Sequence, residues 1–240
     1  MFGVSLPATA TPDNPEFHKF SRGRHVRPSI GHPVNFLIPA RRGSVYFRSM
    51  QTPHADHSNI VLIGFMGCGK STVGRELHTM TGYPLVDTDA VIEEFAGKSI
   101  SRIFEDEGEE TFRDLESRVI RELEHDGASP RIIATGGGIV TRLENREALR
   151  QLGYVVWLRA PVQVILNRTR RNTSRPLLQT ENPADRIRTL LADREPWYRE
   201  TSHLQLDTAG LTSREIATGI LESARYFFGT RQTSPPCPPM

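Results

Sequence analysis

The chain has little cysteine and no long hydrophobic run. Its 240 residues include only two cysteines, Cys68 and Cys237. Two cysteines do not make a disulfide framework, so we expect a reducing compartment and a cytoplasmic protein. No apolar stretch approaches the ~20 residues that a membrane-spanning helix needs. The sequence therefore predicts no membrane partner.

The chain also lacks a strong charge imbalance. Lysine and arginine number 30 against 28 aspartate and glutamate, which gives a formal net charge of +2. A charge this small does not require a nucleic acid or an anionic membrane as partner, and we expect neither. The length allows one domain of ordinary size with tails, and we expect a monomer.

The two ends of the chain differ in composition from the middle. Residues 1–57 contain seven prolines and scattered arginine without apolar periodicity, so we expect a disordered extension. It could be a targeting peptide, for example for a plastid, a miscalled start with Met50 as the true one, or a flexible tail; the last two are favoured. Residues 229–240 are rich in proline and are expected to form a second disordered tail. The domain is expected at 58–228.

A phosphate-binding motif lies near the start of this domain. Residues 64–71 read GFMGCGKS, which fits G-x-x-x-x-G-K-[ST]. Glycines let backbone N–H groups turn inward around an anion, Lys70 would reach the β- and γ-phosphates, and Ser71 would ligate Mg²⁺. An apolar strand precedes the loop and an apolar-striped helix follows it, as the motif requires. Cys68 could be a redox-sensitive thiol, but a small residue that the loop tolerates is the favoured interpretation.

Strands and helices are predicted to alternate through the domain. Strands are expected at 59–63, 84–87, 131–135, 154–158 and 203–206. Helices are expected at 70–81, 89–97, 109–125, 142–151, 161–170, 183–199 and 212–226. Apolar strands that alternate with helices indicate a parallel sheet covered on both faces. The predicted fold is therefore a doubly wound, five-stranded parallel α/β sheet.

Two further clusters are expected to follow strands of this sheet. Asp87 and Asp89 are two residues apart at a strand end, where side chains project to the same side. One could hold Mg²⁺ through water and the other could accept a proton; alternatively Asp89 caps the next helix. Three glycines, 136–138, follow another strand and would let a ligand approach and offer it their N–H groups. Because carboxyl ends of parallel strands form one edge, these clusters should open on the same side as the phosphate loop.

Basic residues mark a third region. Residues 168–176 read RTRRNTSRP, between two expected helices. Such a segment suits a mobile lid that closes over phosphates, although a solvated loop is the alternative. Further on, Arg194 lies near a helix end that Pro196 is expected to terminate or kink.

With these pieces in order, residues 58–226 resemble shikimate kinase. The matching motifs are the phosphate loop at 64–71, D-x-D at Asp87 and Asp89, F-R at Phe112-Arg113, the three glycines, R-P at Arg175-Pro176, and Arg194. The resemblance implies the nucleoside-monophosphate-kinase type of fold, with a mobile lid and a helical substrate-binding segment. It also implies that ATP and shikimate are the substrates and that Mg²⁺ is the cofactor.

The resemblance also implies roles for single residues. The expected catalytic residues are Asp89 as base toward the 3-hydroxyl, Lys70, and Arg175 from the lid. The expected substrate-binding residues are Asp89, Arg113, Gly136, Gly137, Gly138 and Arg194, with the two arginines on the substrate carboxylate. The expected ATP-binding residues are Gly64, Phe65, Met66, Gly67, Cys68, Gly69, Lys70, Ser71, Thr72, Arg168 and Arg175. Ser71 and Asp87 are the expected metal residues. After the last strand, residues 206–210 lack an arginine that the family often has there, so that adenine contact stays unassigned.

Two other functions remain open from the sequence. Another small-metabolite kinase, such as a gluconate kinase, would need a different acceptor set, and a pair of arginines does not exclude gluconate. A catalytically silent nucleotide-binding scaffold is the second alternative. It would not need to keep Lys70, Ser71, Asp87, Asp89 and Arg175 all intact.

Overall fold

The structure of the protein is a computed structural model that describes residues 59–126, 130–170 and 182–232. The elements run in the order β1 (Asn59–Ile63), α1 (Lys70–Thr81), β2 (Leu85–Asp87), α2 (Thr88–Ala96), α3 (Ile100–His125), β3 (Ile132–Ala134), the 3₁₀ helix η2 (Ile139–Thr141), α4 (Leu143–Leu152), β4 (Gly153–Arg159), α5 (Val162–Thr169), α6 (Pro183–Thr201), β5 (Leu204–Asp207) and α7 (Ser213–Gln232). The predicted alternation of strands and helices is confirmed.

The five strands form one sheet in the order β2-β3-β1-β4-β5. Every neighbouring pair is parallel. β1 lies in the middle of the sheet, with β3 on one side and β4 on the other. The strand order therefore reverses at β1, which makes the carboxyl end of β1 a topological switch point. Ligands bind at such switch points, outside the carboxyl ends of the strands.

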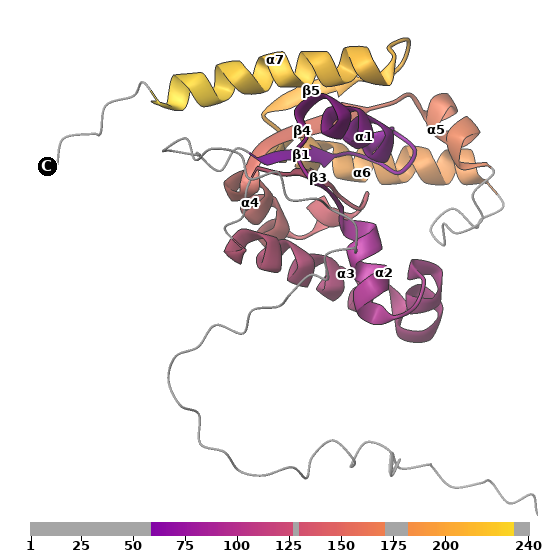
Figure 1. Cartoon of the computed structure of the whole chain (residues 1–240). Helices are drawn as coiled ribbons and strands as arrows, with labels where there is room; N and C mark the ends of the chain where they lie inside the picture. The colour runs from indigo at the N-terminus through magenta and orange to yellow at the C-terminus, as the bar shows by residue number, and fades with distance from the viewer. Residues whose placement is uncertain (1–58, 127–129, 171–181, 233–240) are drawn as a thin grey trace, which may run out of the picture. The chain divides into compact units, whose positions relative to one another are not determined.

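Alternate residues of the strands point to opposite faces of the sheet and pack into an apolar core on each face. Val61 and Ile63 of β1 face a core that α3 and α4 complete. Ile60 and Leu62 face the opposite core, which α1 and α7 complete. Figure 1 shows these two helix layers on either side of the sheet, so the predicted doubly wound fold is confirmed.

Most element ends agree with the prediction, and three departures are informative. Helix α3 begins nine residues earlier than the expected 109, at Ile100, and is interrupted at Gly108, whose backbone is not helical (φ 85°, ψ 174°). Pro196 does not end its helix, because α6 continues to Thr201. Helix α7 extends to Gln232, past both its expected end at 226 and the expected start of the tail at 229.

Helix α6 tolerates Pro196 for a local reason. Proline removes one backbone N–H, so the carbonyl of Ala192, four residues earlier, loses its helical partner. Both residues are exposed, so water can bond that carbonyl.

Within the described ranges, no helix combines the length and the apolar character that crossing a membrane requires. The predicted lid, 168–176, is described only in part: Arg168 and Thr169 end α5, whereas residues 171–176, with Arg175, lie outside the described residues. The whole N-terminal extension also lies outside them.

Candidate active site

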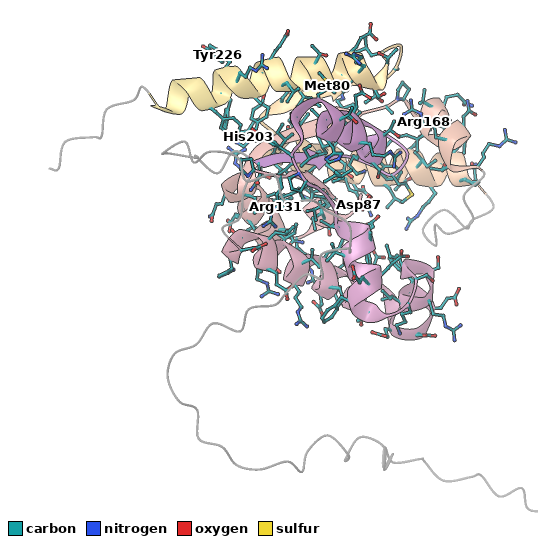
Figure 2. The ribbon with its side chains drawn as sticks, viewed as in Figure 1. Met80, Asp87, Arg131, Arg168, His203 and Tyr226 are labelled. Atoms are coloured by element: carbon teal, nitrogen blue, oxygen red, sulfur yellow. The ribbon has the colours of Figure 1, made fainter. Side chains whose placement is uncertain are left out.

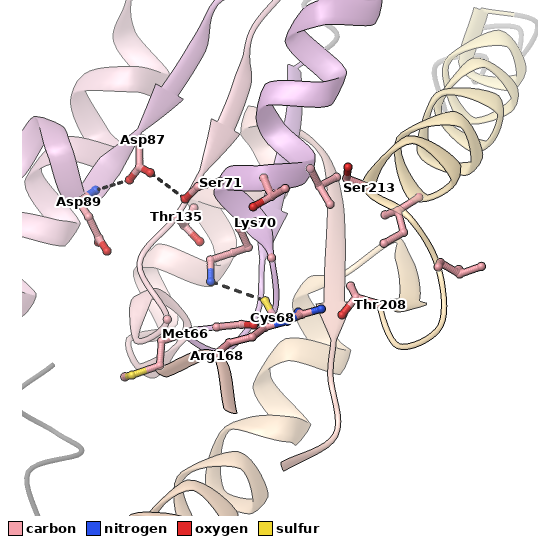
Figure 3. A pocket seen from close by; sticks show the side chains of 17 residues that line it. Met66, Cys68, Lys70, Ser71, Asp87, Asp89, Thr135, Arg168, Thr208 and Ser213 are labelled. Atoms are coloured by element: carbon pink, nitrogen blue, oxygen red, sulfur yellow. Dashed lines mark hydrogen bonds between the residues drawn. The ribbon is translucent and has the colours of Figure 1, made fainter. Parts of the chain in front are cut away.

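A cavity of about 540 Å³ opens at the carboxyl edge of the sheet. It is lined by Met66, Gly67, Cys68, Gly69, Lys70, Ser71, Thr72, Val73, Asp87, Asp89, Thr135, Gly137, Arg168, Thr208, Leu211, Ser213 and Ile216. Figure 2 shows Asp87 and Arg168 at this edge, with Arg131 and His203 at the opposite edge. The phosphate loop, the D-x-D segment and the glycine segment, far apart in sequence, therefore meet around one space (Figure 3).

The phosphate loop owes its shape to three glycines. Gly64, Gly67 and Gly69 have φ values of 136°, 77° and 106°, which side chains disfavour. A methyl group on Gly64 would also overlap the carbonyl oxygen of Leu158. Helix α1 begins directly after Gly69, so its positive N-terminal end faces the cavity and attracts anions.

Lys70 is folded back along this loop. Its Nζ donates to the carbonyl oxygens of Gly64 at 2.7 Å and Phe65 at 3.0 Å. The Sγ atom of Cys68 lies 3.8 Å away from the same ammonium (Figure 3). The side chain is buried against the cavity wall, so its positive charge lies where phosphate oxygens would enter.

Ser71 and Asp87 form a pair beside the loop. Ser71 Oγ donates to Asp87 Oδ2 at 3.0 Å, and Asp87 Oδ1 accepts from the backbone N–H of Asp89 at 3.1 Å. Asp87 is therefore the cap of α2. The expected cap on this helix is therefore present, but Asp87 supplies it and Asp89 does not, because Asp89 lies one residue inside the start of α2.

The hydroxyl oxygen of Ser71 and the carboxylate oxygen Oδ2 of Asp87 fit a magnesium ion. Mg²⁺ prefers hard oxygen ligands and usually takes only one or two from the protein, with water and phosphate supplying the rest. A hydroxyl and a carboxylate in contact at the cavity wall match that need. No group of three or more His, Cys, Asp or Glu suited to a metal occurs among the residues that the structure describes, so an all-protein metal cage is absent there.

Arg113 is buried and held by two glutamates of its own helix. Its Nε and Nη2 donate to Glu109 Oε1 at 3.2 and 2.6 Å, and its Nη1 donates to Glu116 Oε2 at 2.6 Å. Two of its five N–H groups are not needed for these three bonds. The guanidinium orientation is thus fixed before any ligand arrives.

Glu116 is completely buried. Burial disfavours its ionised form and raises the pKa of its carboxyl from 4.5 to about 7, despite the opposing attraction of Arg113. The charges of Asp89 and Arg194 also act on this pKa, so these side chains share one electrostatic environment. Glu116 Oε1 has no hydrogen-bond partner within the described part of the chain.

The three glycines bring the backbone against these charges. A methyl group on Gly136 would lie 2.5 Å from Glu116 Oε1 and 2.7 Å from Asp89 Oδ1, and one on Gly138 would overlap the Arg113 guanidinium. The expectation that all three offer their N–H groups to a ligand needs correction for Gly136. Its N–H donates to Thr88 Oγ1 at 3.1 Å. Thr88 thereby ties the glycine segment to the D-x-D segment.

Arg194 reaches the same region from α6. The residue is buried, and its Nη1 donates to the carbonyl oxygen of Gly137 at 3.1 Å. Its guanidinium carbon lies 5.8 Å from the centre of the Phe65 ring. Arg194 therefore lies between the phosphate loop and the glycine segment.

The remaining cavity wall comes from α5 and from the segment after β5. Arg168 Nη1 donates to the carbonyl oxygen of Gly67 at 3.1 Å, which keeps this side chain over the phosphate loop. The same lining includes Thr208, Leu211, Ser213 and Ile216, none of which was assigned from the sequence. Arg175 lies outside the described residues.

Sequence reasoning also missed four residues that bond predicted site residues without lining the cavity: Thr88, Glu109, Glu116 and Tyr198. Glu109 and Glu116 lie four residues before and three after Arg113, so both are helical neighbours of it. Tyr198 lies four residues after Arg194 by the same rule. Thr88 is the middle residue of D-x-D. Helical spacing from the predicted arginines would have identified three of the four.

Comparisons with known proteins agree with this geometry. The family model described as shikimate kinase matches residues 66–225. The shikimate kinase of Halorhodospira halophila is 48% identical over 166 residues, which cover 69% of this chain and 93% of the relative. That of Acinetobacter baumannii (strain AYE) is 46% identical over 164 residues, 68% of this chain and 90% of the relative.

Solved structures give the same result. A shikimate kinase from Acinetobacter baumannii in complex with shikimate has a TM-score of 0.67 at 43% identity and covers 72% of this chain and 94% of its own. The shikimate kinase from Aquifex aeolicus has a TM-score of 0.58 at 31% identity, and the match covers 73% of this chain and 99% of that one. Fold, motifs and sequence identity agree, and the chain belongs to the shikimate kinase family.

Proposed function

We propose that this protein transfers the γ-phosphoryl group of ATP to the 3-hydroxyl of shikimate, which yields shikimate 3-phosphate and ADP. The proposal rests on one observation: groups suited to bind phosphate and groups suited to bind a hydroxy acid lie at the same edge of the sheet. Asp89 lines the same cavity as the phosphate loop and its lysine. Two buried arginines, Arg113 and Arg194, contact the glycine segment at Gly138 and Gly137. The related shikimate kinases supply the identity of the acceptor.

The nucleotide side is built for phosphates. Backbone N–H groups of the loop and the N-terminus of α1 bind the anion, and the Lys70 ammonium lies against the same cavity. Phosphoryl transfer needs little covalent help from the protein, because charge stabilisation and alignment supply most of the rate. Arg168 would cover the nucleotide from α5, and Arg175 would reach the transferring group from the lid.

Ser71 and Asp87 would hold Mg²⁺, Asp87 through a water molecule. The ion would neutralise charge on the phosphate oxygens. Ser71 and Asp87 keep their own contact at 3.0 Å, so both ligands are oriented before the nucleotide arrives.

The acceptor side is built for a hydroxy acid. Arg113 and Arg194 would bind its carboxylate, since a guanidinium matches a carboxylate in two parallel hydrogen bonds. Gly137 and Gly138 would contact the ring hydroxyls. Asp89 would accept the proton of the 3-hydroxyl late in the transfer.

A gluconate kinase is the nearest alternative, because its substrate is also a hydroxy acid. Relatives named shikimate kinase at 45–48% identity favour shikimate over gluconate. A silent scaffold is disfavoured because Lys70, Ser71, Asp87 and Asp89 all line the cavity.

ADP release with shikimate, gluconate and no acceptor tests the proposal directly. We expect turnover with shikimate only. The methyl ester of shikimate provides a second arm, because it keeps every hydroxyl but offers no charge to Arg113 and Arg194. The ester should lose roughly 2–4 kcal/mol of transition-state binding, so its kcat/KM should be about 30- to 1000-fold lower than that of shikimate. Equal turnover of acid and ester would contradict the arginine clamp, and turnover of gluconate alone would contradict the proposed substrate.

A further inference from the structure

The carbonyl group of Gly137 is a junction between the two halves of the site. A methyl group on Gly137 would lie 3.0 Å from the backbone nitrogen of Met66, so the glycine packs directly on the phosphate loop. Its carbonyl oxygen accepts two hydrogen bonds from α6, one from Arg194 Nη1 at 3.1 Å and one from the Tyr198 hydroxyl at 2.5 Å. One peptide group thus connects the loop, the acceptor-side arginine and a tyrosine.

Tyr198 is rigidly placed for this bond. It is fully buried, and its ring stacks on Trp157 of β4 with 5.5 Å between centroids and 22° between planes. It follows Arg194 by one turn of α6, so both side chains leave the same face of the helix. Burial raises the pKa of Tyr198, and the hydroxyl therefore stays protonated and donates.

The two hydrogen bonds at Gly137 share one acceptor atom, so losing one of them changes the other. A carbonyl oxygen has two lone pairs, and Tyr198 and Arg194 occupy one each. Arg194 donates one N–H to this carbonyl and also acts on the Tyr198 hydroxyl through a side-chain hydrogen bond, and its remaining N–H groups are left for the acceptor. Without the tyrosine hydroxyl, the second lone pair would be left unsatisfied in a buried site, which is unfavourable. Arg194 would then turn further onto the carbonyl and away from the acceptor.

We propose that Tyr198 is a positioning residue for acceptor binding: its hydroxyl holds the Gly137 carbonyl so that Arg194 presents its remaining N–H groups to the carboxylate of a small hydroxy acid. Tyr198 itself does not touch the acceptor. The inference rests on the proposed function and adds to it a residue that selects for the acceptor without contacting it.

Tyr198→Phe tests the proposal, with Tyr154→Phe as the matched control. Tyr154 is also buried, and its hydroxyl also makes one hydrogen bond, to Ser223 Oγ at 2.6 Å. Its ring belongs to the core on the opposite face of the sheet. Each variant loses one buried tyrosine hydroxyl, but only the first loses a contact at the site.

Calorimetric titration of the full chain with shikimate and with a non-hydrolysable ATP analogue gives the readout. For Tyr198→Phe we expect the Kd for shikimate to rise about three- to tenfold, as for loss of one hydrogen bond, and the Kd for the analogue to stay within twofold. For Tyr154→Phe both Kd values should stay within twofold, while its Tm should fall by about as much as that of Tyr198→Phe. An unchanged Kd for shikimate in Tyr198→Phe, or equal weakening of both ligands, would overturn the proposal.

A second background tests the route through Arg194. If Tyr198 acts by orienting Arg194, its substitution should change shikimate affinity less than twofold in Arg194→Lys, where the planar guanidinium is absent. Equal effects in both backgrounds would overturn the mechanism. Failure of the unmodified protein to phosphorylate shikimate would instead contradict the proposed function, so the two failures are distinguishable.

Discussion

Four ionisable side chains meet at the acceptor side of the site, and each depends on the others. Arg113 bonds Glu116, and Asp89 and Arg194 both influence the pKa of that glutamate. Burial makes each charge costly unless an opposite one compensates it. At the residue scale, the site is therefore a balanced group rather than a set of independent ligands, and single substitutions should show it.

Asp89→Asn should remove the proposed base while keeping the shape of the side chain. A general base contributes about 10²–10⁴-fold to rate, so we expect kcat to fall by a factor in this range. ATP affinity should be nearly unchanged, because Lys70 and the loop bind the phosphates. Steady-state assays of ADP release measure both. Asp193→Asn, an exposed aspartate on α6, is the control. Turnover within a few-fold of the unmodified protein would remove Asp89 from the mechanism.

Glu116→Gln should change the pH dependence of stability. The folded state raises the pKa of Glu116 from 4.5 to about 7, so it binds a proton that the unfolded chain releases. Stability from this group is fully present below pH 4.5 and lost as pH rises through about 7. Between pH 5 and 8 the unmodified protein should lose about 2–3 kcal/mol more unfolding free energy than Glu116→Gln. Urea titrations at both pH values measure this, and identical slopes would show that Glu116 is ionised throughout.

At the scale of elements, α3 shows how one residue divides a helix. Gly108 has φ 85° and ψ 174°, a region that only glycine enters readily, and Glu109 directly after it bonds Arg113. The break therefore separates the segment 100–107 from the part of α3 that carries the acceptor-side charges. Periodicity alone identified the second part, since its apolar stripe is continuous only after the glycine.

Gly108→Ala should destabilise the protein although no atom lies within 4 Å of the added methyl group. The cost is conformational and should be about 1–3 kcal/mol. Gly219 is the matched control, because it lies inside α7 with equally open space and without a positive φ. Gly219→Ala should stabilise by about 0.5–1 kcal/mol. Thermal unfolding distinguishes the two, and stabilisation by both would show that α3 can become continuous.

At the scale of the whole molecule, we propose that the kinase domain runs from residue 58 to the end of α7 at Gln232, rather than to 228, and that the segments before and after it are dispensable. The family match at 66–225 and relatives covered to 90–93% of their length support this boundary. Monomeric state and cytoplasmic location stay predictions; light scattering of the purified protein checks the first.

A chain that begins at Met50 should fold, melt within a few degrees of the full chain and keep its turnover. It retains β1, the phosphate loop and every proposed site residue. The prolines and the lack of apolar periodicity give residues 1–49 little to bury. Calorimetry and the shikimate assay on both chains measure this. Aggregation, or an activity loss of more than about tenfold, roughly 1.4 kcal/mol, would show that the extension supports the domain.

The sequence by itself determined the local features of this protein. The phosphate loop, D-x-D and the three glycines are readable because each depends on a few consecutive residues. Strand and helix positions followed from apolar periodicity, which reports the face that each element buries. Even the shared sheet edge was predictable, since parallel strands bring their carboxyl ends together.

Tertiary structure alone decided the strand order, the burial of Glu116 and the contact of Tyr198 with Gly137. β1 pairs with β3 and β4, and such pairing depends on segments far apart in the chain. Glu116 and Tyr198 look ordinary on their helices until packing places them against Arg113 and Gly137. Burial and pKa depend on everything that surrounds a side chain, and a linear sequence does not state those surroundings.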